Sequence, residues 1–199
     1  MTHLRRLALA AAVCAAAGAS TAAAADAPPP AGDPDGIALA QAVNRSYSAP
    51  ARLDLEIVAR FANGTRRERL VLAHGRTRIV VGSWTDERGT ERNITDARGS
   101  FGRAAGERCW TRDGPGGPGG SSPLITLRGS TFHPPERFGA VTRLTVLERI
   151  RGSRRHLWVS YRIDSATERI LTRTFYDLVV RYGTLPSPPP IPDPTPRCR

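Results

Sequence analysis

The chain has 199 residues and a formal net charge of +11, with 29 basic residues, all of them arginine, against 18 acidic ones. This length suits one domain with a sizeable core. The N-terminal apolar stretch is shorter than the roughly 20 residues that cross a bilayer as a helix, and no later run is uncharged for long enough, so we expect no membrane-spanning helix.

Residues 1–25 have the pattern of a secretory signal peptide. Arg5 and Arg6 precede an apolar stretch, and the run Ala23-Ala24-Ala25 lies just before Asp26 as a small-residue cleavage site. We therefore expect export to the periplasm, the cell-wall space or the medium, with a net charge reduced from +11 to +9 by loss of the two arginines. The alternative is a lipoprotein leader, with the chain anchored at a lipidated Cys14.

The positive charge of the mature chain allows two interpretations. It can attract an anionic surface such as phospholipid headgroups or acidic wall polymers. Alternatively, the arginines form the solvated face of the strands, in numbers that reflect a GC-rich genome. We expect an anionic membrane surface or envelope proteins as partners and no nucleic acid.

Residues 26–35 are rich in proline, glycine and alanine and predict a flexible lead-in. The apolar residues that follow recur at helical spacing, which predicts an amphipathic helix from an N-cap at Asp35 to Tyr47, ended by Pro50. A clear half-buried strand comes next, because apolar and polar residues alternate from Leu53 to Phe61. The pattern predicts further strands at 67–73 and 76–84, a short one around 93–97, and one at 107–112 that contains Cys109 and Trp110.

The second half contains a loop, an ambiguous segment and a hairpin. Residues 113–122 form a Gly/Pro/Ser loop, and Pro134-Pro135 forbids a continuous helix or central strand within 123–138. Asp164 begins a polar turn that can hydrogen-bond its own backbone, which predicts a hairpin between two strands. The expected strands are 141–150, 157–164, 169–175 and 177–182, followed by a proline-rich tail over 185–199.

No residue cluster indicates catalysis, a metal or a cofactor. His74, His133 and His156 have no cysteine, histidine or carboxylate at ligand spacing, and no nucleophile elbow or phosphate-binding loop occurs. We therefore expect a protein that is not an enzyme, with no metal and no cofactor. After the leader, Cys109 and Cys198 are the two remaining cysteines, and an exported chain with an even pair favours a disulfide.

The order of these elements resembles the LolA/LppX/LprG type of bacterial envelope lipoproteins and lipid carriers. The resemblance is carried by the helix that begins at Ile37, the Cys109-Trp110 segment, the hairpin phrase that begins at Tyr161, and Tyr182-Gly183 followed by Pro186. It implies a mainly β (α+β) fold, in which a curved antiparallel half-barrel over residues 36–184 has its concave face covered by the N-terminal helix. It also implies an apolar cavity for acyl chains.

The function implied is that of an exported binding protein that shields a lipid or lipidated polypeptide. The alternative is an envelope sensor or interaction module, similar to the RseB type, that binds a regulatory partner protein. Whether the apolar sheet face is a cavity or a packed core stays open. The residues expected to line this face are Leu53, Leu55, Ile57, Phe61, Leu70, Leu72, Ile79, Val81, Val159, Tyr161 and Ile163.

Overall fold

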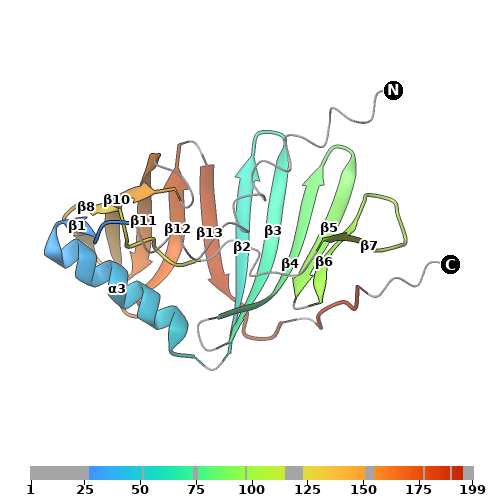
Figure 1. The fold of residues 1–199 in the computed structure, drawn as a ribbon, viewed down its shortest axis with the longest axis horizontal. Helices are drawn as coiled ribbons and strands as arrows, with labels where there is room; N and C mark the ends of the chain where they lie inside the picture. The colour runs from blue at the N-terminus through green and yellow to red at the C-terminus, as the bar shows by residue number, and fades with distance from the viewer. Residues whose placement is uncertain are drawn as a thin grey trace.

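The computed structural model describes residues 27–50, 52–73, 76–96, 98–114, 123–150, 155–176, 178–188 and 190–194. In these ranges one long, curved and unclosed sheet of 13 strands is covered on its concave side by a helix (Figure 1). The predicted mainly β half-barrel is therefore confirmed. We call the concave, helix-covered side the inner face and the opposite side the outer face.

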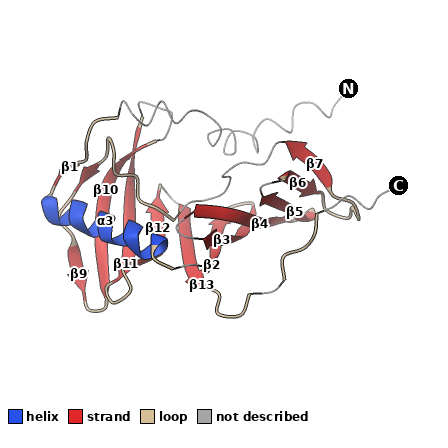
Figure 2. Ribbon diagram, turned by 60° about the horizontal axis from the view of Figure 1, so that its bottom comes forward, coloured by secondary structure: helices blue, strands red, loops and turns tan. Residues whose placement is uncertain are grey.

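The helix α3, drawn in blue in Figure 2, spans Pro34–Ser48 and begins two residues earlier than the sequence pattern indicates. Asp33, not Asp35, is the N-cap, because its side chain accepts a hydrogen bond from the Gly36 N–H at 2.9 Å. Pro34 occupies the first turn, where its fixed φ is favourable and its missing N–H costs nothing. Ala40, Val43 and Tyr47 lie on the buried side of α3 and pack against the sheet.

The first meander contains β2 (Leu53–Phe61), β3 (Gly64–Ala73), β4 (Arg76–Asp86), β5 (Gly89–Asp96), β6 (Gly99–Arg103) and β7 (Thr111–Gly114). The alternation predicted for β2 is confirmed, and the next two strands are present but longer than predicted. The strand expected at 107–112 is wrong over its first four residues, since β7 begins only at Thr111. The short strand expected around 93–97 is present as β5, which begins earlier, at Gly89. β6 was not predicted, because these two strands are too polar for alternation to mark them along their length.

The second group contains β8 (Thr131–Phe132), β9 (Glu136–Phe138), β10 (Val141–Arg149), β11 (His156–Asp164), β12 (Arg169–Phe175) and β13 (Leu178–Thr184). The β11–β12 hairpin is confirmed, with the Asp164 carboxylate accepting hydrogen bonds from the N–H groups of Ala166 and Thr167. β13 pairs antiparallel with both β12 and β2, so it joins the two groups into one sheet.

The two ends of the domain are held more firmly than a flexible lead-in and tail imply. Ala31–Gly32 form β1, which pairs in parallel with β8. After β13 the Leu185 N–H donates to the Asp54 carbonyl at 2.9 Å, and Asp193 forms an ion pair with Arg98 at 3.2 Å. The described part of the tail thus runs beside the ends of β2 to β6, as Figure 1 shows.

Candidate ligand-binding face of the sheet

The inner face carries the apolar core. Most of the residues predicted to line a ligand site lie on this face and are at most 6% exposed. They pack in one contiguous cluster with α3 and with Ile125 and Phe132. The predicted residues in this cluster are Leu53, Leu55, Ile57, Leu70, Leu72, Val159, Tyr161 and Ile163.

Ile79 and Val81 were expected on the inner face, and the structure places them on the outer one. Val80 lies opposite Leu70 in the β3–β4 ladder and is 2% exposed in the core. Since successive side chains alternate between faces, its two neighbours point the other way. Three consecutive apolar residues carry no alternation, so only the pairing with β3 decides which of them faces inward.

The cover of the inner face consists of α3 and the segment 123–130. The Asn44 side chain holds them together, since its Nδ2 donates to the Ile125 carbonyl at 3.0 Å and its Oδ1 accepts from the Ile125 N–H at 2.9 Å. The segment is fixed to the sheet in turn by the Thr126 N–H, which donates to Glu148 at 2.8 Å. The prolines at 134–135 lie outside this cover, between β8 and β9.

We predict that Asn44→Ala loosens this cover, because it leaves two backbone groups of Ile125 without a partner in a largely apolar surrounding. The expected loss is about 1–3 kcal/mol in the free energy of unfolding, measured in urea. Asn63→Ala, the same change in the exposed β2–β3 turn, is the control and should have little effect. Equal losses in the two variants would show that the Asn44 contacts do not hold the cover.

A polar network crosses the inner face beside the core. Glu148, which is 4% exposed, accepts hydrogen bonds from the Tyr161 hydroxyl at 3.0 Å and from Arg173 at 2.6 Å. Arg173 also lies over the rings of Tyr161 and Phe175. Burial, and next the charge of Glu148, raise the pKa of Tyr161 well above its usual range, so its hydroxyl remains a neutral donor.

An apolar rim lies at one end of the inner face, where β2 and β12 end and β13 begins. We define this rim as Phe61, Trp84, Phe175 and Leu178. Phe61 is 41% exposed and packs edge-to-face on Trp84, with ring centroids 5.4 Å apart. Phe175 and Leu178 are half-buried and pack against the core. Phe61 was predicted to lie in the site, and the structure places it at this margin instead of in the buried interior.

Charged groups lie next to the rim. The Arg66 guanidinium is bonded to Glu68, which is 3% exposed, and both belong to β3. Arg173 lies two residues from Phe175 on β12, and its Nε is buried without a hydrogen-bond partner among the described residues. The rim therefore combines partly exposed apolar surface with two guanidinium groups, each paired with a buried glutamate. Sequence patterns had not indicated these groups, because alternation marks apolar residues and both arginines lie at inward positions of their strands.

The remaining expectations concern metals, helices and cysteines. Within the described ranges, no group of three or more His, Cys, Asp or Glu side chains could hold a metal ion. The helices described there include none that is long and apolar enough to cross a membrane. The leader with Cys14 lies outside the described residues. So does Cys198, and its pairing with Cys109 therefore stays a prediction.

Comparison with known proteins gives a match in structure only. No protein-family profile and no curated protein sequence matches the chain. The structure of LprF from Mycobacterium bovis is similar, with a TM-score of 0.50 and 9% identity over 83% of this chain and 99% of that one. The lipoprotein LppX from Mycobacterium tuberculosis gives a TM-score of 0.47 and 9% identity over 77% and 94%. This chain has a LolA/LppX/LprG-like fold, as the resemblance in its sequence implied.

Proposed function

We propose that the protein is a non-enzymatic binding protein of the bacterial envelope that holds an acyl chain of a lipid or lipidated polypeptide against the inner face. The observation that carries this proposal is the apolar rim, which leads from exposed Phe61 into the core. The half-barrel fold supports the proposal, because the resemblance to LolA/LppX/LprG-like proteins implies an acyl-chain cavity on this same face.

In the structure the inner face is packed, so an acyl chain must displace part of the cover as it enters. The rim is the least costly entrance, since Phe61 already leaves part of its ring exposed to solvent. Each methylene buried beyond it gains about 0.8 kcal/mol, so long chains should bind more tightly than short ones. Arg66 and Arg173 lie where a carboxylate or phosphate at the head of the lipid would remain.

The test uses two substitutions that differ only in the face of the sheet. Phe61→Asp places a charge on the rim, whereas Val179→Asp places one at a position of equal exposure, 40%, on the outer face of the adjacent strand. We expect Phe61→Asp to weaken binding of a fluorescent long-chain fatty acid by about tenfold or more, because the chain can no longer pass an apolar margin. Val179→Asp should bind as the parent chain does.

Circular dichroism confirms that both variants are folded before binding is compared. Undiminished binding by a folded Phe61→Asp variant would show that the rim is not part of the binding site. Failure of the parent chain to bind fatty acids of any length, together with the absence of co-purifying lipid in native mass spectrometry, would contradict the proposed function itself.

A further inference from the structure

Six arginines form a row across the outer face, which we call the arginine row. The pairing of neighbouring strands shows the row directly. Arg143 pairs with Arg162, Arg181 and Arg67 both pair with Val58, and Arg92 pairs with Arg103. Thr172, Val58 and Ser83 fill the positions between them. In order across the sheet, the positions of the row are Arg143, Arg162, Thr172, Arg181, Val58, Arg67, Ser83, Arg92 and Arg103.

The charge of this row is only partly neutralised. Arg67 lies 3.5 Å from Glu56, and Arg143 lies 2.5 Å from Glu136; both are surface ion pairs with exposed partners. The row itself contains no carboxylate. Arg92, Arg162 and Arg181 are exposed. Surface pairs of this kind contribute little to stability, so the arrangement is not explained by folding alone.

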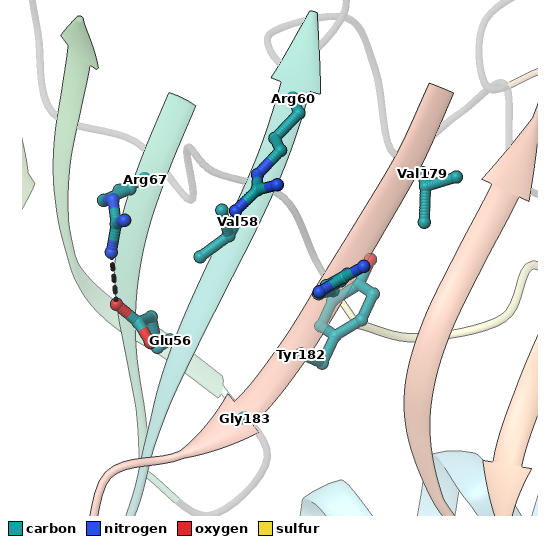
Figure 3. Close-up of a pocket in the computed structure, with 8 residues that line it drawn as sticks. Glu56, Val58, Arg60, Arg67, Val179, Tyr182 and Gly183 are labelled. Atoms are coloured by element: carbon teal, nitrogen blue, oxygen red, sulfur yellow. Dashed lines mark hydrogen bonds and ion pairs between the residues drawn. The ribbon is translucent and has the colours of Figure 1, made fainter. Parts of the chain in front are cut away.

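The centre of the row is hollowed. Figure 3 shows Arg60 and Arg67 beside Val58 and Val179 on β2, β3 and β13, around a pocket of about 290 Å³. Arg181 completes the lining, and Glu56 is the single carboxylate among the lining residues. Three guanidinium groups around an apolar floor make this hollow the place where an anionic group gains most.

We propose that the arginine row binds a linear polyanion, a chain of phosphate or carboxylate groups such as an acidic envelope polymer. Strands lie about 4.8 Å apart, so the row from β10 to β6 is roughly 40 Å long. It crosses the convex side of a curved sheet, where a flexible chain can follow the curve and contact each arginine in turn. A flat bilayer would meet only part of the row.

This site lies on the opposite face from the proposed acyl-chain site, so each proposal can fail without affecting the other. The experiment compares two double variants with the same charge change. Arg92→Gln with Arg181→Gln removes two exposed members of the row. Arg88→Gln with Arg137→Gln removes two exposed arginines outside it, one in the β4–β5 turn and one on β9. The probe is long-chain inorganic polyphosphate, with its affinity measured at several salt concentrations.

We expect the row variant to bind about tenfold or more weakly at low salt, with the slope of log affinity against log salt smaller by about two, roughly one for each arginine removed. The control variant should bind as the parent does. Equal losses would mean that net charge alone attracts the polymer and would overturn the proposal. So would pyrophosphate that binds as tightly as the polymer, or binding to phosphatidylglycerol vesicles with none to polyphosphate.

Discussion

Ile57→Asp is expected to unfold the protein or to reduce its free energy of unfolding by more than about 4 kcal/mol. Ile57 is 3% exposed and belongs to the contiguous core of the inner face. A carboxylate there has no partner, and burial of an unpaired charge is among the most destabilising single changes. Guanidinium unfolding, followed by near-ultraviolet circular dichroism, measures the loss.

Val58→Asp is the matched control, because it is the next residue on the same strand and points to the outer face among Arg60, Arg67 and Arg181. There a carboxylate meets guanidinium groups, so the stability should change little. If Ile57→Asp stays folded and only loses fatty-acid binding, the inner face contains a ligand cavity and not a packed core. Equal destabilisation by the two variants would contradict the assignment of faces.

Glu148→Ala is the second change with a large expected effect. It leaves the half-buried guanidinium of Arg173, the Tyr161 hydroxyl and the Thr126 N–H without their shared acceptor. Removal of one partner from a buried ion pair costs about 3–5 kcal/mol, since the remaining charge is uncompensated. Chemical denaturation should show a loss of that size, accompanied by faster hydrogen exchange in the segment 123–130.

Glu136→Ala breaks an ion pair of nearly the same length, Glu136 to Arg143, between side chains that are both about half exposed. Water and salt screen that pair, so its loss should cost about 0.2–1 kcal/mol. A Glu148→Ala variant no less stable than Glu136→Ala would show that the network contributes nothing beyond a surface contact.

Local patterns were sufficient to predict much of the fold. Alternation in Leu53–Phe61 and in 157–164 marked strands whose apolar side is the core, and the apolar residues after Gly36 marked the helix. The pattern failed where neighbouring residues were chemically alike. Ile79, Val80 and Val81 carry no alternation. The strands β5 and β6 have one large buried apolar residue each, Ile94 and Phe101, which is too few to form a pattern.

The arginine row and the polar network were beyond such patterns for another reason. Arg67 and Arg181 lie far apart in the sequence and become neighbours only because both pair with Val58. Glu148 and Arg173 meet across β10 to β12 in the same way. Register between distant strands depends on how the whole sheet assembles, which no single segment specifies.

The position of β13 determines how late in folding the sheet can be completed. The last strand lies in the middle of the sheet, where Val180 pairs with Ala59, and among the described strands only β13 pairs with both groups. Closure of so long a stretch of chain is slow and entropically costly. The first meander and the second group therefore keep unpaired edges at β2 and β12 until the final strand has been synthesised. During that interval the nascent chain is most exposed to aggregation.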